Sequence, residues 1–258
     1  MLKKILLMLL MLNLGILAHE PAPYRMTVWV PGTNFQTLLP FSGSKFNQTR
    51  LEHFSTFRTG SESQQRAICL EQQDPVQFPL EGFYLFRWSG RLRHSARMSA
   101  RSALFQALLD EIKRIQLSTG RPVHLTILTH SHGGSVGLGL AELNAQAGYP
   151  LRVDRLVLLA CPVQARLAKF VGDPSFKQVY AFYSKSDLLQ VLAPQAWWLI
   201  GARRKFQANS NLVHIQTCWQ SGSGLGHNDF KSLKFLQSVP AILSNLESNW
   251  TAEISLKI

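Results

Sequence analysis

The stretch that decides the fold is Val123-His-Leu-Thr-Ile-Leu-Thr-His-Ser-His-Gly-Gly134. Its first six residues are predicted to form a buried strand, and a helix with small residues is predicted from about Gly133 to Ala147. Ser131 is therefore expected on a sharp turn between a strand and a helix. Such a turn raises the serine oxygen above the edge of a sheet, and it needs small neighbours because strand and helix approach closely.

Apolar runs on both sides of this stretch predict further strands, and the segments between them predict helices. The predicted strands are Met26–Val30, Phe83–Trp88, Val123–Leu128, Arg155–Ala160, Val179–Tyr183 and Leu212–Cys218. Apolar residues at three- and four-residue spacing predict a helix from about Ser95 to Leu117, and two short helices separated near Pro240 are predicted to end the chain. Residues 35–80 are predicted to be a long connection with some helix. Apolar strands that alternate with helices predict one α/β domain, whose mostly parallel sheet is covered by helices on both faces.

The composition excludes several classes of protein. The chain has 258 residues, of which 46% are hydrophobic, and this fraction is typical of a packed core and excludes a disordered chain. Three cysteines are too few for a disulfide scaffold. The 27 Lys and Arg residues exceed the 15 Asp and Glu residues, which suits a nucleic acid, an anionic membrane surface or an anionic substrate. No nucleic-acid partner is expected, because no helix-turn-helix, zinc finger or aromatic RNA platform is found.

The first 18 residues are typical of a targeting segment. Lys3 and Lys4 precede an apolar run from Ile5 to Ala18. A basic start, a short apolar stretch and a small final residue predict a secretory signal peptide, with an uncleaved membrane anchor as the alternative. The run is short for a bilayer span, which needs about 20 residues. We therefore expect residues 1–18 to direct export, periplasmic or secreted, or to hold the protein at a membrane, and residues 19–258 to form the domain.

A serine hydroxyl needs a base to take its proton and an acid to orient that base. In this architecture the chain order is Ser, then Asp or Glu, then His. Asp187 lies just past the predicted strand Val179–Tyr183, at the carboxyl edge where ligand chemistry collects in parallel sheets. His227 lies in a Gly-rich loop after the last predicted strand. The order predicts that Asp187 and His227 serve Ser131, and Asp173 is the alternative acid.

Two backbone N–H groups are expected to stabilise the oxyanion of a tetrahedral intermediate. The residue after the serine, His132, is one donor. The other is expected in the turn after the first strand, where Gly32 allows close approach, so Thr33 is the candidate and Asn34 the second choice. An ordinary turn at these positions is the alternative.

A metal site at His130-x-His132 is a further alternative, because alternate histidines on an extended segment can share one metal. The familiar metallohydrolase string continues with an Asp and a further His, but Ser135 and Val136 stand there. We therefore expect no metal and no cofactor, and we expect His130 to be a packed or hydrogen-bonded histidine beside the serine.

These residues resemble the α/β-hydrolase family, and within it serine esterases and lipases, over most of the chain from Met26 to about Leu246. The similar motifs are Val30-Pro-Gly-Thr-Asn34, Thr129-His-Ser-His-Gly-Gly134, Ser184-Lys-Ser-Asp187 and Leu225-Gly-His227. The resemblance implies a single-domain α/β-hydrolase fold. It also implies a set of roles: nucleophile Ser131, orienter Asp187, base His227, and oxyanion-hole residues Thr33 and His132. Two departures are Pro31, where the family usually has a His, and Thr129, where the turn usually has its first glycine.

The segment 188–211 is a candidate lid. It contains Trp197 and Trp198, followed by the basic run Arg203-Arg-Lys205, and such a patch can touch a lipid or an acyl chain. A packed helix with a solvated charged end is the alternative. We expect a serine hydrolase that cleaves a carboxylic ester of a small molecule or lipid, with an anionic membrane surface as a further partner. The alternatives are an acyltransferase or thioesterase with the same triad, or a non-catalytic binding protein; nothing indicates the oligomeric state.

A run of arginines precedes and begins the long predicted helix. Arg91, Arg93, Arg97 and Arg101 occur in a stretch with no acidic residue from Gly82 through Leu109. Such a run is usually a solvated face. The alternative is that it favours anionic head groups or cell-envelope polymers.

Overall fold

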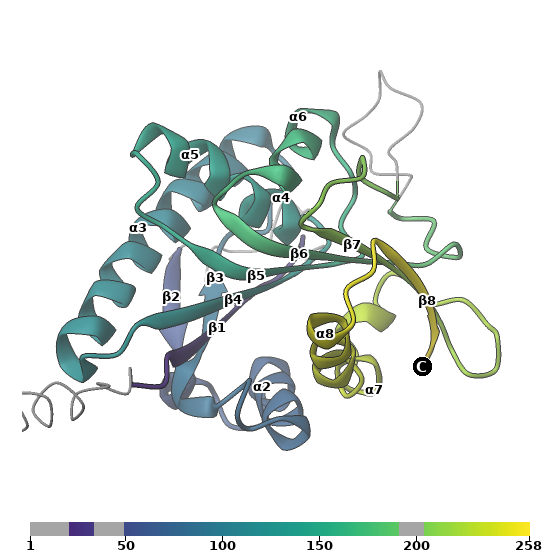
Figure 1. The fold of residues 1–258 in the computed structure, drawn as a ribbon, viewed down its shortest axis with the longest axis horizontal. Coiled ribbons are helices and arrows are strands. Elements are labelled where there is room, and N and C mark those ends of the chain that lie inside the picture. Colours follow the sequence, from purple (N-terminus) through teal and green to yellow (C-terminus); the bar gives the residue numbers. More distant parts are fainter. Residues whose placement is uncertain (1–20, 34–48, 191–203) are drawn as a thin grey trace, which may run out of the picture.

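A computed structural model describes residues 21–33, 49–190 and 204–258 of the chain. These residues form one eight-stranded sheet in the order β2-β3-β1-β4-β5-β6-β7-β8 (Figure 1). The strands are β1 (Tyr24–Val30), β2 (Arg50–His53), β3 (Phe83–Arg87), β4 (Val123–His130), β5 (Val153–Leu159), β6 (Phe176–Tyr183), β7 (Leu212–Cys218) and β8 (Glu253–Lys257). Only the β2–β3 pair is antiparallel in this sheet, so the carboxyl ends of the other strands meet at one edge.

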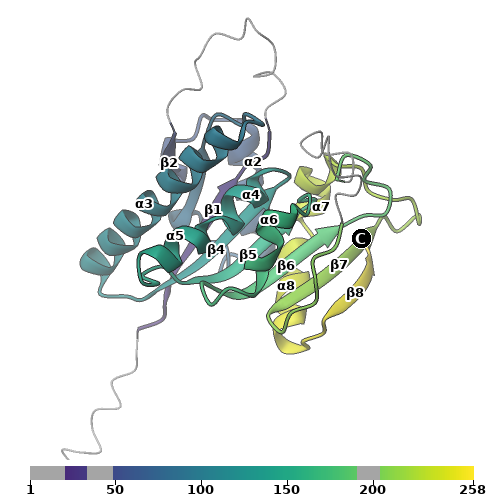
Figure 2. The ribbon, with the colours of Figure 1, turned by 90° about the horizontal axis from the view of Figure 1, so that it is seen from above.

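Helices cover both faces of the sheet, as Figures 1 and 2 show. One face carries α3 (His94–Thr119), α4 (Gly133–Leu138), α5 (Leu140–Gln146) and α6 (Ala165–Ala168). The other face carries α2 (Glu62–Gln73), α7 (Leu233–Leu236) and α8 (Val239–Ser248). The predicted fold class, a single α/β domain with a mostly parallel sheet between two helical layers, is confirmed.

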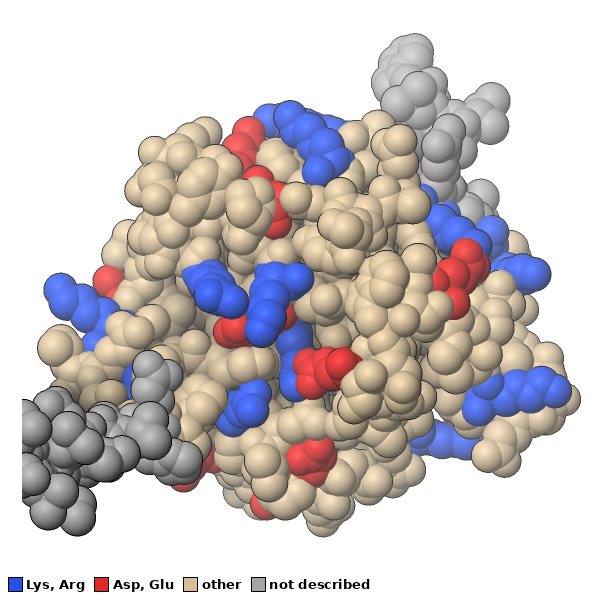
Figure 3. Space-filling view, in the orientation of Figure 1, with Lys and Arg blue, Asp and Glu red and all other residues tan. Residues whose placement is uncertain are grey.

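Charged side chains are interspersed on the face of the molecule that Figure 3 shows, where blue and red groups alternate. Arg155, at the amino end of β5, holds Glu247 of α8 through Nε–Oε1 and Nη2–Oε2 distances of 2.5 and 2.7 Å. The excess of positive charge therefore does not form one continuous basic patch on this face.

Within the described ranges, no helix is both long enough and apolar enough to cross a bilayer.

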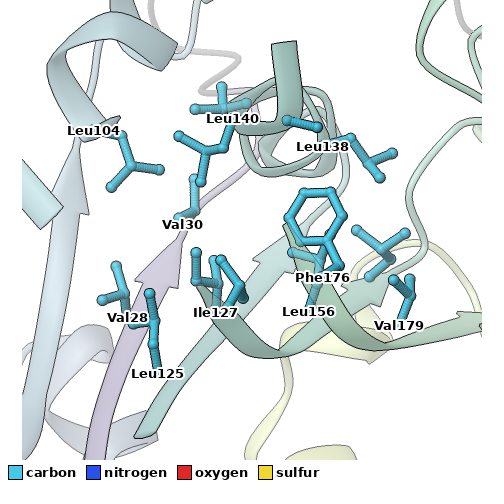
Figure 4. Close-up of a cluster of buried hydrophobic side chains, with 14 of the residues drawn as sticks. Val28, Val30, Leu104, Leu125, Ile127, Leu138, Leu140, Leu156, Phe176 and Val179 are labelled. Atoms are coloured by element: carbon cyan, nitrogen blue, oxygen red, sulfur yellow. The ribbon is translucent and has the colours of Figure 1, made fainter. Parts of the chain in front are cut away.

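Two hydrophobic cores lie on the two faces of the sheet. Val28 and Val30 of β1 belong to one core and Trp29 to the other, because successive strand residues point to opposite faces. Figure 4 shows the first core, where Leu125 and Ile127 of β4 pack near Leu104 of α3. Each fully buried aliphatic side chain of this kind contributes about 1.5–3 kcal/mol of transfer free energy, so both faces hold the sheet in place.

The helices differ in detail from their predictions. The predicted helix 95–117 is α3, which ends where Gly120 adopts a left-handed φ of 67°. The helix predicted over 133–147 is two helices, α4 and α5, which meet at Gly139. A Cβ atom on Gly139 would lie 2.1 Å from Nε of Arg101, so this glycine leaves room for a buried guanidinium.

Two edge strands were missing from the prediction. Residues 35–80, predicted to be a connection with some helix, contain β2 as well as α2. The prediction that helices end the chain was wrong, because β8 follows α8 and pairs with β7. Residues of β8 alternate between half-buried and exposed, and β2 is four residues long. Such short edge strands carry little hydrophobic signal, because pairing with a neighbouring strand, rather than burial, holds them in place.

Candidate active site

Ser131 lies at the turn from β4 into α4, at the carboxyl edge of the sheet. Its φ is 53°, in the left-handed region that costs a non-glycine residue about 1–2 kcal/mol. The Ser131 N–H donates to the Leu159 carbonyl at the end of β5 (2.9 Å), and the Gly134 N–H donates to the Ser131 carbonyl (3.0 Å). These bonds hold a strained backbone that lifts the serine oxygen off the strand, as the sequence predicts for a nucleophile turn.

Glycines make this turn possible, because the surrounding backbone is too close for a side chain. A Cβ atom on Gly133 would lie 2.4 Å from the Val30 carbonyl oxygen. A Cβ atom on Gly134 would lie 2.3 Å from Cys161 Sγ. In the turn after β1, a Cβ atom on Gly32 would lie 2.7 Å from Ser131 Cβ. The turns after β1 and β4 are therefore in direct contact.

Thr129 stands at the position where the nucleophile turn usually has its first glycine. Its hydroxyl donates to the Val157 carbonyl on β5 (3.0 Å), so the polar atom is satisfied although the residue is fully buried. Its methyl carbon Cγ2 lies against Gly137 of α4, where a Cβ atom would be 3.0 Å away. The space that the usual glycine would provide on the strand is thus provided by a glycine on the helix.

The structure brings Ser131, Asp187 and His227 together. His227 Nε2 lies 2.8 Å from Ser131 Oγ, although the two residues are 96 positions apart in the chain. His227 Nδ1 lies 2.9 Å from Asp187 Oδ2. The serine follows β4, the aspartate follows β6 and the histidine follows β7, so three strand ends at one sheet edge supply the three groups.

Further bonds position the carboxylate. Asp187 is 1% exposed, and its Oδ1 accepts a bond from the backbone N–H of Gln190 (3.1 Å). The buried Gln190 amide donates in turn to the Cys161 carbonyl after β5 (3.0 Å). Arg204 donates to the Asp187 carbonyl (3.1 Å). Sequence reasoning did not identify Gln190, since a single glutamine after an Asp carries no recognisable motif.

His130 holds the loop that carries His227. Its Nε2 is 3.0 Å from the His227 carbonyl oxygen, which can only accept, so this nitrogen of His130 carries the proton. Burial lowers the pKa of His130 to about 3, so its ring is neutral at physiological pH. The expectation of a hydrogen-bonded histidine beside the serine matches this contact.

The two predicted oxyanion donors lie next to the serine. His132 follows Ser131 directly, and Thr33 follows Gly32, which is packed against Ser131 Cβ. Within the described ranges, neither the Thr33 nor the His132 backbone N–H donates a hydrogen bond to another protein group. Neither N–H group is thus occupied by a protein acceptor among the described residues.

The other candidates lie elsewhere. Asp173 accepts from the Ser175 N–H (2.9 Å) in the turn before β6, and His214 accepts from the Phe206 N–H (3.1 Å) within the sheet. Asn34, Trp197 and Trp198 lie outside the described residues, as do residues 191–203 of the predicted lid 188–211 and the whole predicted signal or anchor, 1–18. Among the residues that the structure describes, no group of three or more His, Cys, Asp or Glu side chains is arranged to hold a metal ion.

No protein-family model and no curated protein sequence matches the chain. Among solved structures, an esterase from Rhizomucor miehei is 10% identical with a TM-score of 0.49, covering 90% of this chain and 77% of its own. Carboxyl esterase 2 of Tuber melanosporum is 10% identical with a TM-score of 0.43, covering 89% and 78%. Acyl-protein thioesterase 2 of Zea mays is 12% identical with a TM-score of 0.39, covering 88% and 95%.

The fold class follows from the chain's own geometry. The sheet is mostly parallel, the strained serine turn joins the central strand β4 to a helix, and the aspartate and histidine follow later strands in the order Ser, Asp, His. These are the features of the α/β-hydrolase fold that the sequence predicted.

Proposed function

We propose that this protein is a serine hydrolase that cleaves a carboxylic ester through an acyl-enzyme. One observation carries the proposal: the His227 ring bridges Ser131 Oγ and Asp187 Oδ2 at 2.8 and 2.9 Å. Hydrogen-bond distances between nucleophile and base, and between base and carboxylate, are the geometric signature of an activated serine.

In the proposed reaction, Ser131 Oγ attacks the ester carbonyl carbon while His227 Nε2 takes the hydroxyl proton. Asp187 stabilises the imidazolium and remains ionised. The carbonyl oxygen becomes an oxyanion, which the N–H groups of Thr33 and His132 stabilise. Collapse of this intermediate breaks the bond to the alcohol oxygen, which takes the proton from His227. Water then attacks the acyl-enzyme carbonyl carbon while His227 takes a proton from the water. The bond from the acyl carbon to Ser131 Oγ breaks, Oγ takes the proton back from His227, and the acid is released.

The surroundings favour His227 over two neighbouring histidines as the proposed base. His130 uses Nε2–H to bind the His227 carbonyl, and burial lowers its pKa to about 3. Burial and the charge of Arg97 lower the pKa of His132 to about 4. Neither ring therefore takes a proton readily at neutral pH, and only His227 is hydrogen-bonded to the serine.

The experiment that tests this proposal combines hydrolysis with active-site labelling. Ser131→Ala is expected to abolish hydrolysis of short p-nitrophenyl esters and covalent labelling by a fluorophosphonate, with the labelled peptide identified by mass spectrometry. Ser135→Ala is the matched control, because Ser135 is also buried and lies one turn further on, in α4. Retention of activity or label in Ser131→Ala would show that another residue is the nucleophile.

Lipid contact through Trp197 and Trp198, an anionic membrane surface and export all stay predictions. Trp197, Trp198 and residues 1–18 lie outside the residues that the structure describes. The hydrolysis assay above uses small-molecule esters, so its outcome is independent of these predictions.

A further inference from the structure

The amino-terminal turns of α3 bury two arginines close to the candidate active site. Arg97 is 6% exposed and Arg101 is 1% exposed. The helix begins after Arg93 and has no acidic residue in its first turn. The amino end of a helix carries a partial positive charge and normally attracts anions. Arg97, at the end of the first turn, is the opposite of the usual arrangement, and both buried cations need an explanation.

Arg101 has partners within the protein. Its Nε donates to the Ser135 carbonyl on α4 (3.0 Å), and its Nη1 is 3.7 Å from Oε2 of Glu142. The guanidinium lies in the space that Gly139 leaves open. Arg101 therefore joins α3 to α4 and α5 as a structural residue.

Arg97 lacks an anionic partner. Its Nη1 donates to the Leu92 carbonyl (2.5 Å), while its Nε is buried without a hydrogen-bond partner. Among the described residues, no carboxylate forms an ion pair with Arg97, and none contributes to its pKa. Burial and the charge of Arg101 lower that pKa to about 10, so the group is still a cation at neutral pH. Buried charges in proteins are almost always paired, and an unpaired one indicates a missing partner.

The fold places Arg97 on the helix that packs against α4, the helix that begins just after His132. The bond from Arg101 to Ser135 fixes α3 against α4. Arg97 lies one turn before Arg101, and His132 lies three residues before Ser135. The charge of Arg97 is, after burial, the largest cause that lowers the pKa of His132. His132 is itself buried, and its Nδ1 has no partner among the described residues. Arg97 Nε and His132 Nδ1 are thus two buried polar atoms without a partner in the described part of the chain, on α3 and at the start of α4, the two helices that Arg101 joins, and His132 directly follows Ser131.

We propose that Arg97, with His132 beside it, recognises a negatively charged group of the substrate close to the ester that is cleaved. The proposal rests on the proposed function and names its substrate class: an ester that also carries a carboxylate or a phosphate. A guanidinium fits both groups, because its planar fork donates two parallel hydrogen bonds to a pair of anionic oxygens. The substrate anion would supply the missing partner of Arg97.

A matched pair of substrates tests the carboxylate. Mono-p-nitrophenyl adipate and p-nitrophenyl hexanoate have acyl chains of the same length, and only the first carries a negative charge. We expect the ratio of their kcat/KM values to fall by about 30-fold or more in Arg97→Gln, the scale expected when one partner of a buried charge pair is removed. Arg97→Lys is expected to restore part of the ratio, since it returns the charge without the fork. Arg91→Gln, at an exposed arginine of the same segment, is the control and keeps the wild-type ratio.

A second pair tests the phosphate. Lysophosphatidylglycerol and a monoacylglycerol with the same acyl chain are compared by release of fatty acid. If the kcat/KM ratio depends on Arg97 only in the adipate pair, the substrate anion is a carboxylate. If it depends on Arg97 only in the lipid pair, the anion is a phosphodiester. A dependence in both pairs indicates a site that accepts either anion. Equal ratios in the wild type and Arg97→Gln for both pairs would overturn the proposal.

Binding without turnover separates this proposal from the proposed function. In Ser131→Ala, we expect adipate or inorganic phosphate to raise the melting temperature, and the added change Arg97→Gln to abolish that rise. A rise that is the same with and without Arg97 would overturn the anion site even if the protein hydrolyses esters. A rise that depends on Arg97 would support the anion site even if fluorophosphonate labelling showed that Ser131 is not a nucleophile.

Discussion

From the contact between Thr129 and Gly137 we predict how much stability the protein loses when the space for the threonine methyl group is filled. A Cβ atom on Gly137 would lie 3.0 Å from Thr129 Cγ2. Two carbon atoms prefer about 3.5–4.0 Å, so Gly137→Ala creates an overlap of about 0.5 Å or more. Overpacking of this kind costs about 1–3 kcal/mol, while Ala in place of Gly inside a helix stabilises by about 1 kcal/mol. We therefore expect Gly137→Ala to lower the free energy of unfolding by about 0–2 kcal/mol.

The same substitution is expected to behave differently when the methyl group is absent. Thr129→Ser removes Cγ2 and keeps the hydroxyl that donates to the Val157 carbonyl. In that background Gly137→Ala keeps its helix benefit and loses the main clash, although Leu156 Cδ1 remains 3.2 Å away. We expect a coupling free energy of about 1–2 kcal/mol between the two positions, since residues in contact couple by about 0.5–3 kcal/mol.

Urea unfolding of the wild type, the two single variants and the double variant measures this coupling. Ser102→Ala, at an exposed position on α3, is the control partner for Thr129→Ser, and its effect should add independently. Additive effects of Thr129→Ser and Gly137→Ala would refute the explanation that Gly137 makes room for the threonine methyl group. Hydrolysis of p-nitrophenyl butyrate by each variant then shows whether the position of Ser131 depends on this packing.

Three further predictions concern charge and protonation. Asp187→Asn is expected to lower kcat for p-nitrophenyl butyrate by about 10⁴-fold with little change in melting temperature, because an amide no longer holds the catalytic tautomer of His227; a loss below tenfold would contradict the orienting role. His130 has a pKa of about 3 in the folded protein, whereas its ordinary pKa, which applies to the unfolded chain, is about 6.5. As the pH falls below about 6.5, this histidine takes up a proton in the unfolded chain but not in the folded protein. The free energy of unfolding therefore decreases from about pH 6.5 down to about pH 3. His130→Gln is expected to reduce the pH dependence of the unfolding free energy by up to about 1.4 kcal/mol per pH unit between pH 4 and 6, and an unchanged slope would contradict the buried neutral ring. Arg97→Met is expected to raise the urea midpoint in phosphate-free buffer, because it removes a buried charge without a carboxylate partner; a lowered midpoint would indicate that the packing of Arg97 contributes more than its charge costs.

The three residues that meet at the sheet edge could be selected from the sequence, because the signals for them are local or depend on chain order. Glycines after a serine at the end of an apolar run are recognisable within a few residues. Asp187 and His227 follow later strands, and parallel strands bring their carboxyl ends to one edge of the sheet, so their order in the chain was sufficient to select them. The edge strands β2 and β8 were missed because hydrogen bonds to strands distant in the chain, rather than their own hydrophobicity, hold them.

The arginine run shows where sequence patterns reach their limit. Its residues look alike in the sequence, and a solvated face was the usual interpretation. In the structure Arg91 and Arg93 are exposed, whereas Arg97 and Arg101 are buried. The difference arises from α4, which packs on one side of α3 and offers a carbonyl to Arg101.

Local patterns in the chain were therefore enough for the α/β class, the serine turn and the selection of the Asp and the His that meet Ser131, because each depends on neighbouring residues or on chain order. Burial and partners were not available at that level. Three features depend on contacts between distant segments of the chain. Gly137 accommodates Thr129, Gln190 orients Asp187, and Arg97 lacks a carboxylate partner among the described residues. These contacts form only when helices pack on the sheet, and the proposed selection of an anionic ester depends on them.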